Sequence, residues 1–153
     1  MSKKKVRKKK NNMETVTINN LKETAKFAKK FAKLLQGGEI ILLNGDLGAG
    51  KTTFTRQVLK ALGVKGEVTS PTFTIMREYA TKKFNIYHFD MYRIKTPDEV
   101  REFGLEDYIY SGDNKSLVFI EWSENIKEML KGKFIEINIS LIDDQKRKFE
   151  IIR

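Results

Sequence analysis

Residues 45–52 read Gly45-Asp46-Leu47-Gly48-Ala49-Gly50-Lys51-Thr52, which completes the pattern G-x-x-x-x-G-K-[ST]. Residues 39–44 precede this loop and predict a buried parallel strand, because the unbroken β-branched and leucine run at 40–43 suits a sheet covered on both faces. A helical pattern follows over residues 51–62 and ends at Gly63. Strand, glycine loop and helix therefore stand in the order that a phosphate-binding loop (P-loop) requires.

The loop residues predict nucleotide binding. Glycines let backbone N–H groups turn inward around a β-phosphate, and the amino end of the following helix adds its positive dipole. We expect Lys51 to reach the β- and γ-phosphates, Thr52 to ligate Mg²⁺ and Thr53 to bond an α-phosphate oxygen. The chain has no N-K-x-D run of the guanine-reading type, which favours ATP over GTP. The predicted nucleotide-binding residues are Asp46, Leu47, Gly48, Ala49, Gly50, Lys51, Thr52 and Thr53.

Two acidic residues follow other apolar segments. Glu121 comes after residues 117–120, and Asp90 comes after residues 86–89. A P-loop needs an acid at the end of a neighbouring strand to hold the metal or to orient the attacking water. We predict Glu121, Asp90 and Lys51 as catalytic residues, and Thr52, Glu121 and Asp90 as metal ligands. Spacing leaves open which acid contacts the metal, although Glu121 is preferred; a helix cap or a surface ion pair is the alternative for Asp90.

Three further features have two interpretations each. Ser70, Pro71 and Thr72 lie one helix after the loop, where NTPases often keep a segment that senses the γ-phosphate, but they could simply connect helix to strand. His88 is the one histidine, and an isolated histidine in a strand is more often structural than catalytic; no second ligand stands at metal spacing. Trp122 could pack under the nucleotide or close the core.

The remaining segments predict an α/β class, a three-layer P-loop NTPase-like fold with a mixed parallel and antiparallel sheet. Strands are expected at residues 14–18, 73–76, 84–89, 117–120, 134–141 and 148–152, with hairpins joining 73–76 to 84–89 and 134–141 to 148–152. A helix is expected at residues 21–35, capped by Asn19 or Asn20, and a short helical region should start at Thr96 and Pro97. The predicted apolar face of the helix at 21–35 consists of Leu21, Ala25, Phe27, Ala28, Phe31, Leu34 and Leu35.

Composition limits the domain number and the chemistry. The 153 residues, 40% of them hydrophobic, predict one domain over residues 13–153. Because the chain has no cysteine, disulfides, thiolate zinc sites and cysteine nucleophiles are excluded, in agreement with a cytoplasmic location. No apolar run is long enough to cross a bilayer or to form a signal peptide, so we expect no membrane partner.

The positive charge is concentrated at the amino terminus. The formal net charge is +10, and seven of these charges come from residues 3–10. A block of like charges repels itself, so we expect residues 1–12 to form a disordered basic tail. The tail could be an arm for RNA or DNA, or a solubilising terminus, since no aromatic residue stands among its lysines to stack on bases.

Five segments together resemble the TsaE (YjeE) family, the ATPase of bacterial tRNA threonylcarbamoyladenosine biosynthesis. They are residues 44–54, 69–74, 87–93, 102–108 and 119–124, and the resemblance extends over about residues 18–152. Five segments in the family's order are more specific than a P-loop alone, which many unrelated ATPases share.

The resemblance implies a small cytoplasmic ATPase with ATP and Mg²⁺ as cofactors. Its implied partners are TsaD, the threonylcarbamoyl transferase, and TsaB, and its ATP hydrolysis would support turnover of their complex. By the family pattern, Lys51 and Thr52 hold phosphate and metal, Glu121 and Asp90 serve the Mg²⁺ and the water, and Ser70, Pro71 and Thr72 form a nucleotide-sensing switch. The basic tail is outside the family pattern, so a tail-mediated tRNA contact stays open.

Two other functions compete with this interpretation. A small-molecule kinase would use the same loop but would need an acceptor pocket and an arginine-bearing lid, for which no clear segment exists. A basic RNA-binding module would hold its nucleotide for structure only. Arg77 and Arg93 are the candidates for an arginine finger; if a partner supplies that charge instead, the isolated chain should hydrolyse ATP slowly.

Overall fold

The computed structural model describes residues 12–153. The basic tail expected at residues 1–12 therefore lies outside the described residues, except for Asn12. The strands are β1 (Met13–Ile18), β2 (Ile40–Asn44), β3 (Met76–Ala80), β4 (Asn85–Asp90), β5 (Ser116–Glu121), β6 (Ile135–Leu141) and β7 (Arg147–Ile152). The helices are α1 (Leu21–Ala32), α2 (Lys51–Ala61), α3 (Pro97–Glu102), α4 (Glu106–Ile109) and the 3-10 helix η1 (Ser123–Met129). None of these helices has the length and apolar character that crossing a bilayer requires.

The described strands form one mixed sheet with the order β1-β7-β6-β2-β5-β4-β3. Its centre is parallel: β2 lies between β5 and β6, and β4 pairs with the other edge of β5. The flanks are antiparallel, with β3 on β4, β7 on β6 and β1 on β7. The α/β class and the mixed sheet predicted from the sequence are therefore confirmed.

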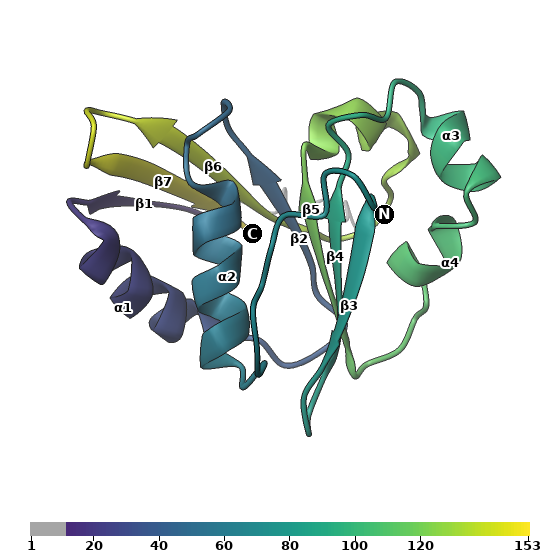
Figure 1. Cartoon of the computed structure of the whole chain (residues 1–153), viewed down its shortest axis with the longest axis horizontal. Helices are drawn as coiled ribbons and strands as arrows, with labels where there is room; N and C mark the ends of the chain where they lie inside the picture. Colours follow the sequence, from purple (N-terminus) through teal and green to yellow (C-terminus); the bar gives the residue numbers. More distant parts are fainter. Residues whose placement is uncertain (1–11) are drawn as a thin grey trace, which may run out of the picture.

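Helices cover both faces of the sheet, as Figure 1 shows, with α1 and α2 on one side and α3 and α4 on the other. Strand β2 contributes to both interfaces, because Ile41 and Leu43 join the core under α1 and α2, whereas Leu42 joins the core on the opposite face. Burial of each such side chain stabilises the fold by about 1.5–3 kcal/mol. Because β2 is covered on both faces, its continuous apolar run at residues 40–43 is buried between two layers of helices, which gives the fold its three layers.

Helix α1 is shorter than predicted. It ends at Ala32 instead of residue 35, with Asn20 as its N-cap; the Asn20 side chain accepts a 2.9 Å hydrogen bond from the Glu23 N–H. Two residues assigned to the buried face are exposed, Leu21 by 72% and Leu34 by 54%. Leu21 belongs to the first turn, and Leu34 follows the last, so neither lies over the sheet.

Strand β3 starts later than predicted. The sequence predicts a strand at residues 73–76, but the segment before Met76 is a turn in which Ile75 N–H donates to the carbonyl of Pro71 at 2.6 Å. Ile75 has a φ of 67°, and Phe73 is 80% exposed. The hairpin itself is confirmed, since Met76 pairs with Phe89 in antiparallel register.

Candidate nucleotide-binding site

The glycine loop connects β2 to α2 in a shape that only glycine permits at key positions. Gly45 has a φ of 152°, and a Cβ added there would lie 2.4 Å from the carbonyl oxygen of Ile139. Gly50, the N-cap of α2, has a left-handed φ of 111°. The loop therefore packs closely against β6 and exposes backbone N–H groups at the amino end of α2.

Lys51 is buried at the start of α2, with 5% of its surface exposed. Its Nζ donates to the carbonyl oxygen of Gly45 and to that of Asp46 at 3.3 Å, and it lies 3.8 Å from the centre of the Trp122 ring. Burial lowers the pKa of Lys51 from its ordinary value, although the nearby Glu121 carboxylate opposes this change. The ammonium group is thus held inside the loop by backbone carbonyls and an aromatic face.

The two predicted acids end neighbouring parallel strands and face each other in register, Asp90 on β4 and Glu121 on β5. Both are buried. Oε1 of Glu121 accepts a hydrogen bond from the Thr52 hydroxyl at 2.7 Å, and its Oε2 lies 2.6 Å from Nε2 of His88. Glu121 is therefore the acid that contacts the threonine of the loop.

Asp90 contacts the predicted switch instead. Its Oδ2 accepts hydrogen bonds from the hydroxyls of Ser70 at 3.0 Å and Thr72 at 2.9 Å, while Oδ1 accepts one from the Tyr92 N–H at 2.9 Å. Pro71, between them, is buried. The turn that displaces β3 is what brings both hydroxyls to one carboxylate oxygen.

Two cavities meet at the loop. The smaller, about 280 Å³, is lined by every predicted site residue except Asp46 and Pro71, together with Tyr92 and Trp122. The larger, about 510 Å³, lies between the start of α1 and the turn before β7. Gly48, Ala49, Gly50 and Thr53 line both cavities, so the loop forms part of the wall of each.

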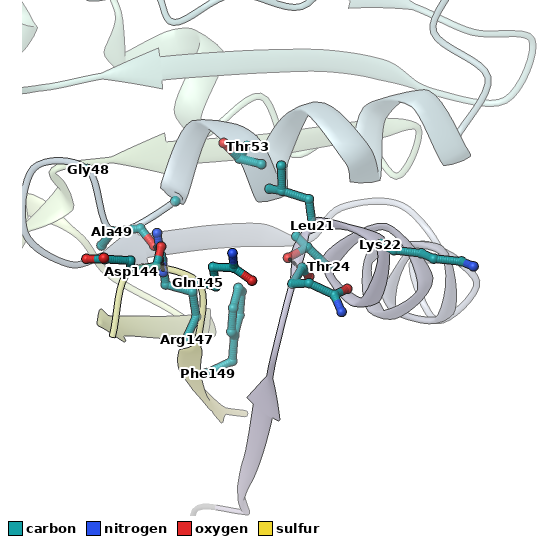
Figure 2. A pocket seen from close by; sticks show the side chains of 12 residues that line it. Leu21, Lys22, Thr24, Gly48, Ala49, Thr53, Asp144, Gln145, Arg147 and Phe149 are labelled. Carbon is teal, nitrogen blue, oxygen red and sulfur yellow. Dashed lines mark hydrogen bonds between the residues drawn. The ribbon is translucent and has the colours of Figure 1, made fainter. Parts of the chain in front are cut away.

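Figure 2 shows the larger cavity, with Leu21 and Thr24 from α1 facing Gln145 and Arg147 across it and the ring of Phe149 between them. Arg147 also reaches the loop, since its Nε donates to the carbonyl oxygen of Ala49 at 3.0 Å. The exposed Leu21 thus belongs to a cavity wall, which accounts for its position outside the core.

Sequence reasoning missed some residues of this site. His88 is not among the predicted site residues, yet its Nε2 lies 2.6 Å from Oε2 of Glu121; Arg147 was not considered at all. For His88 a signal existed, because it stands two residues before Asp90 and so on the same face of its strand. The two arginine-finger candidates do not line the smaller cavity: Arg77 lies on β3, and the Arg93 guanidinium lies 4.4 Å from the Phe73 ring centre.

Comparisons with known proteins agree on one family. The sequence profile described as "Threonylcarbamoyl adenosine biosynthesis protein TsaE" matches residues 18–149. The chain is 50% identical over 132 residues to the tRNA threonylcarbamoyladenosine biosynthesis protein TsaE of Rickettsia prowazekii, covering 86% of this chain and 89% of the relative. The protein of that name from Bacillus subtilis is 38% identical over 129 residues, covering 84% and 78%. Among solved structures, Bacillus subtilis YdiB superposes with a TM-score of 0.77 at 31% identity, covering 94% of this chain and 86% of the other.

Proposed function

Because this chain belongs to the TsaE family of tRNA threonylcarbamoyladenosine biosynthesis, we propose that it binds Mg-ATP and hydrolyses it as a subunit of the modification machinery. One observation carries this proposal. The hydroxyl of the loop threonine Thr52 is bonded to Glu121 at the end of the strand next to β2, which unites the phosphate-binding loop with an acid. This is the constellation that P-loop hydrolysis requires.

The two cavities that border the loop suggest how the nucleotide lies. The phosphates would occupy the smaller cavity, against the loop N–H groups and Lys51, and the base and ribose the larger one. The larger cavity offers the apolar faces of Leu21 and Phe149 and the polar groups of Asn20 and Gln145, a mixture suited to a purine ring.

The oxygens in the smaller cavity suit Mg²⁺. Magnesium prefers hard oxygen ligands, keeps several waters and usually takes one or two carboxylates plus phosphate oxygens. Thr52, Glu121 and Asp90 supply a hydroxyl and two carboxylates to this cavity. The bound ion would neutralise developing phosphate charge.

Each side chain of the site would then have a separate role in binding or hydrolysis. Lys51 would release the Gly45 and Asp46 carbonyls and contact the β- and γ-phosphates. Thr52 would turn its hydroxyl oxygen to the metal, which frees Oε1 of Glu121 for a water near the γ-phosphate. Asp90 would hold Ser70 and Thr72 in reach of that phosphate, so that their positions report whether it is present.

The proposal also includes partner proteins, which would supply an arginine to the smaller cavity. In the part of the chain that the structure describes, no arginine lines the smaller cavity. We therefore expect slow hydrolysis by the isolated chain and stimulation by the TsaB and TsaD proteins, since an arginine supplied in trans is worth roughly 10³–10⁵ in rate.

The test is phosphate release from Mg-ATP by the purified protein, alone and with TsaB and TsaD. Glu121→Ala is the variant, and Glu128→Ala, an exposed acid on η1, is its matched control. Stimulated release that is lost in Glu121→Ala and kept in Glu128→Ala supports the proposal. The proposal fails if no condition releases phosphate, and ATP consumed without free phosphate would indicate transfer to an acceptor, as in a kinase.

A further inference from the structure

His88 is fully buried on β4, on the face of the sheet that carries α2, and it is the only histidine of the chain. It stands opposite Phe119 on the parallel strand β5, while Asp90 stands opposite Glu121. The side chain of His88 thus reaches diagonally across one step of the sheet, and its Nε2 lies 2.6 Å from Oε2 of Glu121.

The carboxylate of Glu121 is held from two sides. Thr52, on α2, donates to Oε1, and His88, on β4, contacts Oε2. A carboxylate without the second contact can rotate about its last side-chain bond and exchange its two oxygens. The Oε2 contact removes that freedom, so that Oε1 remains directed at the loop.

The position of the ring proton follows from the other ring nitrogen. Nδ1 of His88 is buried without a hydrogen-bond partner among the described residues. Because an ionised carboxylate can only accept, the proton of the 2.6 Å contact belongs on Nε2. The geometry therefore favours the Nε2–H tautomer.

We infer that His88 is a positioning residue that donates from Nε2 to Oε2 of Glu121 and thereby assigns Oε1 as the oxygen that acts on the attacking water. This inference rests on the proposed ATP hydrolysis. Groups that orient a metal-site ligand through one hydrogen bond change affinity or activity by about 10–100-fold when removed. Because His88 lines neither cavity, its effect should reach the chemistry only through Glu121.

The kinetic test compares His88→Leu, which cannot donate, with His88→Gln, whose side-chain amide can donate toward Oε2. We expect His88→Leu to lower kcat by about 10–100-fold with the KM for Mg-ATP within about threefold of wild type, and His88→Gln to recover much of the loss. Ile86→Ala is the stability control, because Ile86 is equally buried on the same face of β4 and does not bond to Glu121. It should retain wild-type kcat below its melting temperature.

A second measurement does not depend on activity. With nitrogen-15-labelled histidine the protein has one imidazole spin system, so its tautomer can be assigned without ambiguity. We expect the Nε2–H pattern in wild type, with a slowly exchanging Nε2 proton that exchanges faster in Glu121→Ala. An Nδ1–H pattern, or a proton unaffected by Glu121→Ala, overturns the inference.

The outcomes separate the two proposals. A wild-type protein that releases no phosphate, alone or with partners, overturns the proposed function. Hydrolysis by wild type with an equal kcat in His88→Leu leaves that function intact and overturns the positioning role alone. A His88→Gln variant as slow as His88→Leu also overturns it, because the donated bond is then not what matters.

Discussion

Thr52 donates a 2.7 Å hydrogen bond to Glu121, although 69 residues separate them in the sequence. The bond joins the first turn of α2 to the end of β5 across the adjacent strand β2. In the nucleotide-bound state that we propose, the Thr52 oxygen would turn to Mg²⁺ and this bond would open. Binding of the metal by Thr52 would then release Oε1 of Glu121.

Thr52→Val should remove the metal preference of nucleotide binding. Valine keeps the shape of threonine but has no oxygen, so Mg²⁺ loses one ligand and we expect the Mg²⁺-dependent gain in ATP affinity to fall by about tenfold. Thr52→Ser keeps the oxygen and should preserve the gain. Titration with a fluorescent ATP analogue, once with Mg²⁺ and once with a chelator, measures the gain in affinity. Equal gains in wild type and Thr52→Val would contradict the assignment of Thr52 as a metal ligand.

Asp90→Asn should loosen the segment at residues 70–75. One amide group cannot accept from both the Ser70 and Thr72 hydroxyls and also replace the oxygen that binds Tyr92 N–H. Hydrogen bonds to a charged group contribute about 1.5–3 kcal/mol, so amide hydrogen exchange in this segment should accelerate at least about tenfold. Asp98→Asn, an exposed acid on α3, should leave the segment unchanged. Unaltered exchange in Asp90→Asn would refute the role of Asp90 as holder of the switch.

Lys51→Met should keep or raise thermal stability while abolishing stabilisation by Mg-ATP. Burial lowers the pKa of Lys51, which means that the folded state binds this proton less tightly than the unfolded state. The resulting penalty is fully present below the lowered pKa and disappears as pH rises from that pKa toward the ordinary 10.5. A change of order 1 kcal/mol moves the melting temperature by about 2–4 °C in a chain of this size.

Melting curves with and without Mg-ATP provide the measurement, with Lys60→Met, an exposed lysine on the same helix, as control. The difference in melting temperature between Lys51→Met and wild type should shrink as the pH rises above the lowered pKa of Lys51. A variant that melts well below wild type at neutral pH would show that the carbonyl and Trp122 contacts outweigh burial.

Much of the fold follows from local signals. The apolar run before Gly45 forms β2, the pattern after Gly50 forms α2, and both acids end strands as the sequence predicts. These features depend on residues that are neighbours in the sequence, so they can be predicted from the sequence alone. The placement of Asp90 beside Glu121 needed one more fact, the parallel pairing of β4 with β5, which spacing alone does not supply.

The predictions from sequence were wrong or incomplete where tertiary contacts override the local sequence pattern. Phe73 and Ile75 have strand-forming side chains, yet the bonds of Ser70 and Thr72 to Asp90 hold their segment in a turn. Leu21 fits an apolar helix face, yet it borders a cavity. Arg147 lies 98 residues from Ala49, and no local rule connects a terminal hairpin to a glycine loop.

Arg147→Ala should weaken nucleotide binding without changing the chemistry. Its Nε donates to the Ala49 carbonyl at 3.0 Å, and its guanidinium also donates to the carbonyl of Asp143 at 3.1 Å, so one side chain ties the glycine loop to the turn before β7. Loss of bonds worth about 1.5–3 kcal/mol should reduce ADP and ATP affinity by about tenfold or more, with kcat at saturation within about threefold. Arg147→Lys should recover little, because an ammonium group lacks the fork that reaches both carbonyls. Arg101→Ala, an exposed arginine on α3, is the control, and calorimetric titration with ADP is the measurement. Wild-type ADP affinity in Arg147→Ala would show that the loop keeps its shape without the terminal hairpin.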